Sequence, residues 1–200
     1  MDGELMEFGP GLGDFLERFK SQGKLIDAVE NEAQFLEGLK LLSRTVVEKL
    51  DDLPGQYDGI VSVNVLEHIE DDRRALRDLH AKLKPNGVLN LYLPASQILY
   101  GHLDALVHHF RRYDRAELVD KVEGAGFEIE EVFNVDAVGF IAFGIYKILK
   151  WGDGNITPGS MAFYDNVVFP FTYIVDPLVG RSFGRSIYLR ARKKGILDNS

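Results

Sequence analysis

The chain has 200 residues, of which 46% are hydrophobic and 27% are charged, a composition typical of one soluble globular domain with a sizeable core. The formal net charge of −8 argues against nucleic-acid binding through broad phosphate neutralisation. Because the chain contains no cysteine, disulfides, thiolate metal sites and cysteine nucleophiles are excluded.

No segment has the pattern of a signal peptide. The longest uncharged apolar runs, residues 137–146 and 166–175, are too short to span a bilayer. We therefore expect a cytoplasmic protein without a transmembrane segment.

Residues 7–13, with the sequence EFGPGLG, follow a short apolar run. They precede a segment in which Phe15, Leu16 and Phe19 recur at helical spacing, so the order predicts a strand, a glycine turn and a helix. Such a turn brings bare backbone and a helix amino terminus close to a ligand. The glycine spacing differs from the G-x-G-x-x-G of dinucleotide-binding folds.

A second predicted strand, residues 24–29, ends at Glu30 and Asn31. An acidic residue at this position can accept hydrogen bonds from both ribose hydroxyls of a nucleotide cofactor. The alternative is a solvated glutamate, and the preceding glycine turn favours the ribose role. A helix over 33–42 and a weaker third strand over 45–48 follow.

A continuous apolar strand over 59–63 predicts a central strand that is buried on both faces. It runs into residues 64–69, NVLEHI, in which His68 alone is more typical of a structural histidine than of a base. A helix with the buried stripe Leu76, Leu79 and Leu83 is predicted next. Residues 84–87, KPNG, are expected to end this helix in a turn before a fifth strand over 88–93.

Residues 100–113 are dense in polar side chains that can bind a substrate or transfer protons. Three histidines occur within eight residues, but no HxxxH or HxH spacing is present, so we do not expect a metal site. Two readings stay open for residues 111–113, Arg-Arg-Tyr: substrate contact, or capping and ion pairing before the next helix.

A helix over 115–123 and an alternating strand over 127–133 come next, followed by an apolar helix from Phe140 to Trp151. Another aromatic-rich stretch, residues 161–179, follows. Core or oligomer packing is the preferred role of both segments, ahead of a substrate pocket or a membrane contact. Residues 184–193 are predicted to form the final strand.

Several of these motifs together resemble class I S-adenosylmethionine-dependent methyltransferases, in a bacterial branch that acts on small molecules and lipids. They are the E-x-G-x-G-x-G turn, NVLEHI at 64–69, LKPNG at 83–87, AGFE at 125–128, and the LYG-x-x-D and HHFRRY patterns within 99–113. The resemblance implies an α/β fold with a doubly wound, mostly parallel, seven-stranded sheet whose last strand is antiparallel between the fifth and sixth. It also implies one domain over 1–200, with a cofactor-binding half over 1–95, substrate-facing and apolar insertions over 96–183, and the final strand over 184–193.

The same resemblance assigns roles to residues. The cofactor would be S-adenosylmethionine, held by Glu7, Phe8, Gly9, Gly11, Gly13, Glu30, Asn31, Leu50, Asn64 and Val65. A hydroxyl acceptor needs a base, for which His109 and His68 are the candidates. The substrate-binding candidates are Tyr100, His102, Asp104, Arg112 and Tyr113. The acceptor would be a small molecule or lipid-like compound, and a homodimer and a peripheral membrane contact both stay open.

Two departures from the family pattern keep alternatives open. Lys49 occupies the position at which the family commonly places an acid for the adenine amino group, and the chain begins almost on the first strand, without the usual helical segment that covers the cofactor. One alternative is therefore a methyltransferase-like binding or scaffold protein with weak or no catalysis. The other, a nucleotide-dependent oxidoreductase, is disfavoured by the glycine spacing.

Overall fold

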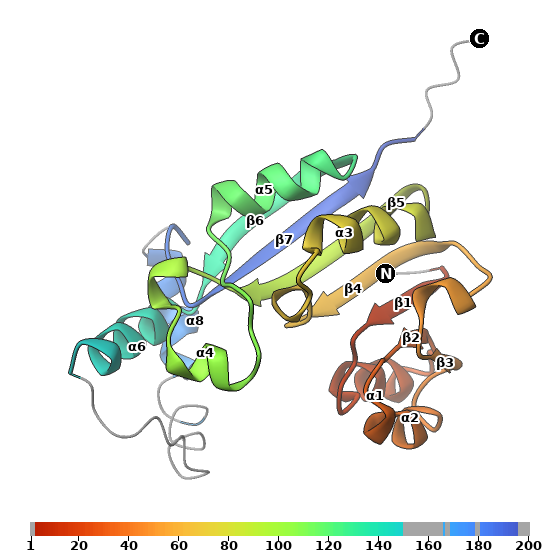
Figure 1. Ribbon diagram of the computed structural model, residues 1–200, viewed down its shortest axis with the longest axis horizontal. Helices are drawn as coiled ribbons and strands as arrows, with labels where there is room; N and C mark the ends of the chain where they lie inside the picture. The colour runs from red at the N-terminus through yellow and green to blue at the C-terminus, as the bar shows by residue number, and fades with distance from the viewer. Residues whose placement is uncertain (1–2, 150–165, 167–168, 179–180, 196–200) are drawn as a thin grey trace.

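The computed structural model describes residues 3–149, 166, 169–178 and 181–195. Within them, seven strands form one sheet in the order β3-β2-β1-β4-β5-β7-β6 (Figure 1). The strands are β1 Leu5–Phe8, β2 Asp27–Val29, β3 Thr45–Val47, β4 Tyr57–Val63, β5 Leu83–Pro94, β6 Phe127–Val135 and β7 Ser186–Lys193. The five strands from β3 to β5 pair in parallel, and β7 lies antiparallel between β5 and β6. The expected α/β sheet with an antiparallel final strand is confirmed.

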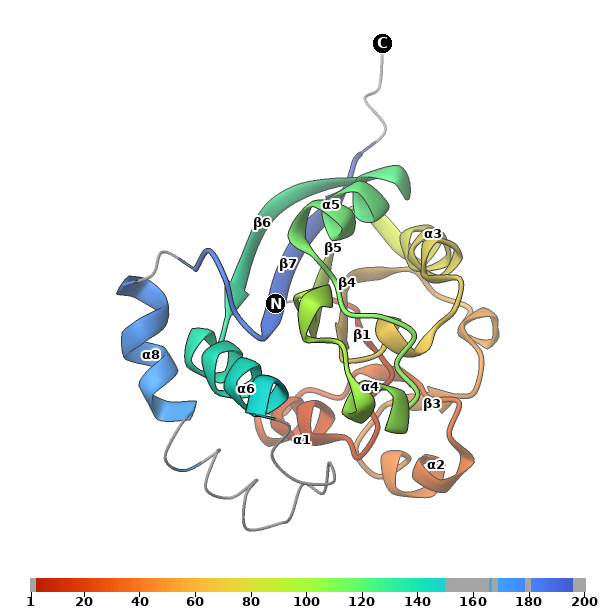
Figure 2. The same cartoon turned by 60° about the vertical axis from the view of Figure 1, so that its left-hand side comes forward.

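Helices connect these strands. They are α1 Asp14–Ser21, α2 Ala33–Leu39, α3 Asp72–Lys82, α4 His102–Leu106, α5 Arg115–Gly124, α6 Ala137–Leu149 and α8 Phe169–Leu178, with short 3-10 turns at Leu50–Asp52, Leu66–His68 and Gln97–Leu99. Helices α3 and α5 lie side by side and contact β5 and β6 respectively (Figure 1). Helices α6 and α8 pack against each other (Figure 2). The parallel strands β4 and β5 point their carboxyl ends toward the side on which α4 and α6 lie.

The core lies between the middle of the sheet and its covering helices. Ile60 on β4 and Leu89 on β5 are fully buried, as the continuous apolar runs predict for central strands. Leu76 and Leu79 place the apolar stripe of α3 against them in one buried cluster. The rigid centre of the sheet therefore positions the loops at its carboxyl edge.

The expected turn between α3 and the fifth strand is wrong in detail. Helix α3 ends at Lys82, and Leu83 already pairs with Tyr57 as the first residue of β5. The pairing then shifts register, with Gly59 opposite Val88, so residues 84–87 form an irregularity inside the strand. Leu83 is fully buried, but it packs into the core from the sheet rather than from the helix.

The apolar segment near the carboxyl end is described only in part. Helix α6 begins at Ala137, three residues before the expected start at Phe140, whereas Trp151 and most of 161–179 lie outside the described residues. In the described part of the chain, the helices are all too short or too polar to cross a membrane.

Candidate functional site

A cavity of about 830 Å³ opens at the carboxyl edge of the sheet, the edge at which open α/β sheets bind ligands. The ends of β1, β2, β3 and β4 meet there, and the segment after α4 closes one side. The lining residues are Phe8, Gly9, Gly11, Val29, Glu30, Asn31, Glu32, Gln34, Phe35, Glu48, Lys49, Leu50, Asp51, Asn64, Val65, His68, Ile69, Ala75, Asp78, Val107, His108 and Phe110. Eight of the ten residues expected to hold a cofactor are among them; Glu7 and Gly13 are not.

The glycine turn approaches the cavity with backbone alone. Gly9, Gly11 and Gly13 all have positive φ, at 77°, 56° and 87°. A Cβ atom on Gly9 would lie 2.4 Å from Cγ2 of Val65, whereas one on Gly11 would meet nothing within 4 Å. Gly9 is therefore required by close packing against the cavity wall, and Gly11 leaves open space toward the cavity. Gly13 instead packs against α2, since a Cβ there would meet Leu39.

Glu30 closes the end of β2 with both carboxylate oxygens engaged. It is 5% exposed, and Oε2 accepts a 2.8 Å hydrogen bond from the amide of Gly11. Oε1 accepts one of 2.9 Å from the amide of Glu32. A fixed anion with two acceptor oxygens thus lies on the cavity wall beside the glycine turn, which suits it to bind a vicinal diol.

Glu7 lies behind the glycine turn on β1. It is 3% exposed, and its Oε2 has no hydrogen-bond partner. Burial, together with the negative charges of Asp14 and Glu30, raises the pKa of Glu7 to about 7. Glu7 is therefore a buried acid that readily takes up a proton near neutral pH.

The opposite wall is formed by the residues that follow β4. Asn64 has a φ of 52°, and its amide donates to the carbonyl of Tyr92, which turns the chain toward the cavity. At the far rim, Lys49 is exposed, and Asp51 and Glu48 line the same cavity. Carboxylates are therefore available next to the lysine that departs from the family pattern.

His68 lines the cavity, and His109 lies behind it. Their rings meet edge to face with centroids 4.6 Å apart. Nδ1 of His109 lies 2.9 Å from Oδ1 of Asp104, which also accepts from Nε of Arg112 at 2.8 Å. Burial, and secondarily the electrostatic interaction with His109, lower the pKa of His68, which favours its neutral imidazole.

The predicted substrate residues do not line the cavity. Asp104 and Arg112 are buried together, and the Tyr100 hydroxyl donates to the carbonyl of His109 at 2.7 Å. His102 is exposed at the start of α4. Tyr113 is 1% exposed and donates to Asp72. Apart from His102, these side chains hold residues 100–113 in place instead of facing the open space.

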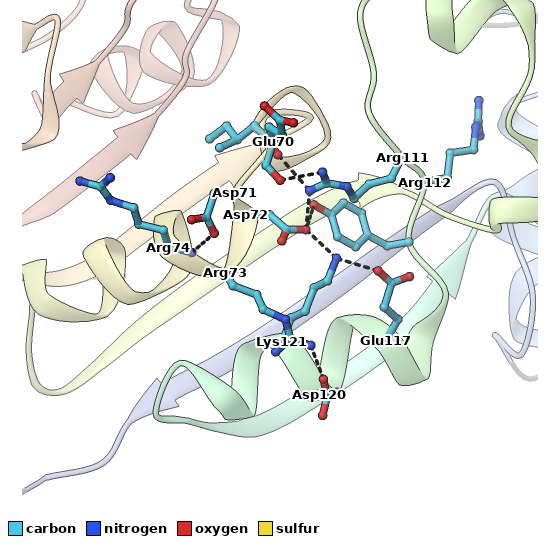
Figure 3. Close-up of polar contacts among 12 residues, drawn as sticks. Glu70, Asp71, Asp72, Arg73, Arg74, Arg111, Arg112, Glu117, Asp120 and Lys121 are labelled. Atoms are coloured by element: carbon cyan, nitrogen blue, oxygen red, sulfur yellow. Dashed lines mark hydrogen bonds and ion pairs between the residues drawn. The ribbon is translucent and has the colours of Figure 1, made fainter.

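Asp72 is the centre of a buried polar network (Figure 3). Its Oδ2 accepts from Tyr113 at 2.9 Å and pairs with Lys121 and Arg111 at 2.7 Å each. Burial alone would raise the pKa of Asp72, but hydrogen bonds from Lys121, Tyr113 and Arg111 lower it. Arg111 also donates to the carbonyl of Ile69, so the network ties 111–113 to the start of α3. Of the two open readings for Arg111 and Tyr113, their contacts are those of the structural one.

Glu67 was not among the expected site residues. It is fully buried beside His109, and neither carboxylate oxygen has a hydrogen-bond partner. Its one sequence signal is a charged residue inside the otherwise mostly apolar NVLEHI segment. Sequence alone cannot distinguish it from a solvated glutamate, because its surroundings come from residues some 40 positions later.

The chain is similar in sequence to one protein-family model and to two curated proteins. A family model described as a methyltransferase domain matches residues 1–132. A ubiquinone biosynthesis O-methyltransferase from Pseudomonas paraeruginosa is 27% identical over 104 residues, which are 46% of this chain and 45% of that protein. An uncharacterised protein from a Synechococcus strain is 46% identical over 43 residues, 22% of this chain and 10% of that protein. The chain thus spans less than half the length of these curated relatives.

Solved structures share the fold at low identity. A SAM-dependent methyltransferase from Thermotoga maritima is 18% identical, with a TM-score of 0.63, over 97% of this chain and 83% of that one. One from Archaeoglobus fulgidus is 20% identical, with a TM-score of 0.59, over 95% and 86%. The [4+2]-cyclase SpnF is 17% identical, with a TM-score of 0.60, over 98% and 76%. At these identities the likeness concerns the fold.

Proposed function

The chain belongs to the methyltransferase-domain family, and from that membership we propose that it is an S-adenosylmethionine-dependent methyltransferase acting on a small-molecule or lipid-like acceptor. The observation that carries the proposal is the pair of Glu30 and the glycine turn on one cavity wall. An acidic strand end next to bare backbone fits the ribose and the amino-acid end of one extended ligand. The cofactor, when bound, supplies a methyl group on a sulfonium.

We assign the cofactor to residues around that wall. Glu30 holds the ribose hydroxyls, while Gly9, Gly11 and Asn64 border the amino-acid end. Leu50 packs against the adenine ring. Asp51 is proposed to accept a hydrogen bond from the adenine amino group, since it lines the same cavity two positions after Lys49.

The acceptor is proposed to be at least partly apolar. Val107 and Phe110 line the cavity and are each 51% exposed, so an apolar edge faces the open space. An aromatic or isoprenoid-like compound would cover that edge and bury apolar area. The partial relative from Pseudomonas paraeruginosa, named for ubiquinone biosynthesis, supports this class of acceptor.

His68 and His109 are the proposed catalytic groups. His68 has its ring in the cavity lining and His109 is held behind it by Asp104. An imidazole at this position can accept, as a general base, the proton that a hydroxyl acceptor must lose. Placement of the acceptor oxygen in line with the sulfur–methyl bond supplies the rest of the rate enhancement.

A second candidate is a binding protein or a non-methylating catalyst with the same fold. The cyclase among the structural neighbours has this architecture, and fold alone does not fix the reaction. Lys49 at the adenine rim also favours weaker cofactor binding.

The experiment is methyl transfer from S-adenosylmethionine carrying a labelled methyl group to a panel of phenolic, catecholic and amine acceptors. The proposed enzyme transfers label to at least one acceptor, and His68→Asn slows the transfer to a hydroxyl acceptor. If the protein binds S-adenosylhomocysteine but labels no acceptor in a broad panel, the second candidate is the better account.

A further inference from the structure

Three donor groups from two segments of the chain converge beside the cavity. They are the carboxylate of Glu67 and the imidazoles of His68 and His109, and one donor atom from each lies within 4.8 Å of the other two. Nε2 of His109 is 3.9 Å from Oε1 of Glu67. The histidine spacing in the sequence predicts no metal site, but the fold adds a carboxylate that the spacing does not reveal.

Glu67 is a buried acid whose carboxylate makes no hydrogen bond. Its side chain is 0% exposed, and both carboxylate oxygens are without a hydrogen-bond partner. Its backbone is fixed, because its carbonyl accepts a 2.8 Å hydrogen bond from the amide of Phe110. A buried carboxylate with no hydrogen-bond partner is costly, and either a bound proton or a bound cation can compensate it at this point.

His109 is oriented as metal-bound histidines usually are. Burial alone would raise the pKa of Asp104, but hydrogen bonds from His109 and Arg112 lower it, so Asp104 is an anion that only accepts. Nδ1 of His109 must therefore carry the hydrogen, which leaves the lone pair of the neutral ring on Nε2, the atom near Glu67. In metal sites, the ring nitrogen of a histidine ligand that does not bind the metal commonly donates its hydrogen to a carboxylate.

We propose that Glu67, His68 and His109 bind a divalent transition-metal ion of the zinc type, with Asp104 positioning His109. Two imidazole nitrogens and one carboxylate oxygen form a donor set that catalytic zinc and non-haem iron sites use. Bonds of about 2.1 Å in a tetrahedral site place donor atoms about 3.4 Å apart. Side-chain rotations that bring the donor atoms up to about 1.4 Å closer together therefore suffice.

Three protein ligands leave a coordination position open. His68 lines the cavity, so this position adjoins the space assigned to the acceptor. The role of the ion, unlike its binding, rests on the proposed function: it would bind a hydroxyl oxygen of the acceptor and lower the pKa of that hydroxyl, whose proton passes to water. In this form the two imidazoles act by holding the ion.

The test is a titration of the chelator-treated protein with Zn²⁺ by calorimetry, and with Co²⁺ by visible absorption. We expect one equivalent of Zn²⁺ to bind with micromolar or tighter affinity and Co²⁺ to give the absorption of a low-coordinate site. Glu67→Gln should weaken binding at least about tenfold, by analogy with the loss seen when a supporting carboxylate is removed. The matched control is Glu70→Gln, the same change on an exposed glutamate three residues away, which should bind as the unaltered protein does.

Because Glu67 is buried, misfolding of Glu67→Gln would also abolish Zn²⁺ binding. A second variant, at an exposed residue, distinguishes the two causes. His68→Gln alters an exposed ring and should weaken Zn²⁺ binding while the thermal unfolding temperature without metal stays unchanged. Failure of the unaltered protein to bind one equivalent, or equal affinity in Glu67→Gln, overturns the proposal. Parallel titration with S-adenosylhomocysteine separates the metal-site proposal from the proposed function. If S-adenosylhomocysteine binds and Zn²⁺ does not, only the metal site is overturned. If Zn²⁺ binds and S-adenosylhomocysteine does not, the metal site stands and the proposed function is overturned.

Discussion

The carboxylate of Glu30 and the amide of Gly11 are joined by a 2.8 Å hydrogen bond that links the end of β2 to the glycine turn after β1. Because Glu30 is also engaged with the amide of Glu32, the acid organises two backbone segments on one cavity wall. The wall is therefore preformed, and a ligand that binds there meets an anion and bare backbone already in place.

Gly9→Ala should damage this wall. The added methyl group would lie 2.4 Å from Val65, so either the turn or the β4 end must move. We expect S-adenosylhomocysteine to bind at least about tenfold more weakly, a free-energy loss of about 1.4 kcal/mol or more.

The matched control for Gly9→Ala is Gly23→Ala. Gly23 also has a positive φ, of 75°, but a Cβ atom there meets nothing within 4 Å. It should therefore lower stability by about 1 kcal/mol through backbone strain without changing the affinity. Equal effects of the two changes on affinity would contradict the assigned role of Gly9.

The sequence predicted the sheet well because its signals are local. Continuous apolar runs, glycine turns and helical stripes set the order of elements, and the motif at residues 7–13 with Glu30 marked the cavity wall. The register shift at 84–87 was not predictable, since it depends on how Tyr57 and Gly59 pair across the sheet.

The polar residues of 100–113 show the limit of the sequence as a guide to the site. Asp104, Arg112 and Tyr113 have the residue types of a substrate site, yet their side chains are buried against one another or against Asp72. Burial of a polar group depends on partners far away in the chain. For the same reason the environment of Glu67 was visible only once β4 and the segment after α4 were placed together.

Asp72→Asn should destabilise the protein strongly. The change leaves Lys121, whose side chain is 10% exposed, without the charge of its main buried partner. We expect a loss of about 3 kcal/mol or more in the free energy of unfolding, measured by urea titration. The control Asp120→Asn removes an exposed partner of Arg73 and should change stability little. A small effect of Asp72→Asn would show that the network contributes little.

Stability should depend on pH through Glu67. Burial raises the pKa of Glu67 to about 7 from an ordinary value of 4.5, so the folded state binds the proton more tightly than the unfolded state. The stabilisation is complete below pH 4.5 and is lost as pH rises through 7, by roughly 3 kcal/mol in total. In chelator, Glu67→Gln should therefore gain stability relative to the unaltered protein as pH increases from 5 to 8, and Glu70→Gln should not. A constant difference across this range contradicts the raised pKa.

His68→Asn should reduce turnover of a hydroxyl acceptor by about 10²-fold or more, since the ring either accepts the proton or holds the ion that lowers the pKa of the hydroxyl. S-adenosylhomocysteine affinity should change little, which separates catalysis from cofactor binding. His102→Asn is the control, because His102 is exposed and outside the cavity lining. Equal rates for the two variants, measured by label transfer, contradict the catalytic role.

The most direct test of the central claim is calorimetric titration with S-adenosylhomocysteine, with NAD as the competing cofactor class. We predict micromolar binding, about −8 kcal/mol, for the first and none for the second. Glu30→Gln should weaken binding about tenfold or more by removing a charge-assisted acceptor, while Glu37→Gln, on an exposed side chain outside the cavity, should have no effect. Absence of binding, or a Glu30→Gln protein that binds as tightly as the unaltered one, would contradict the account.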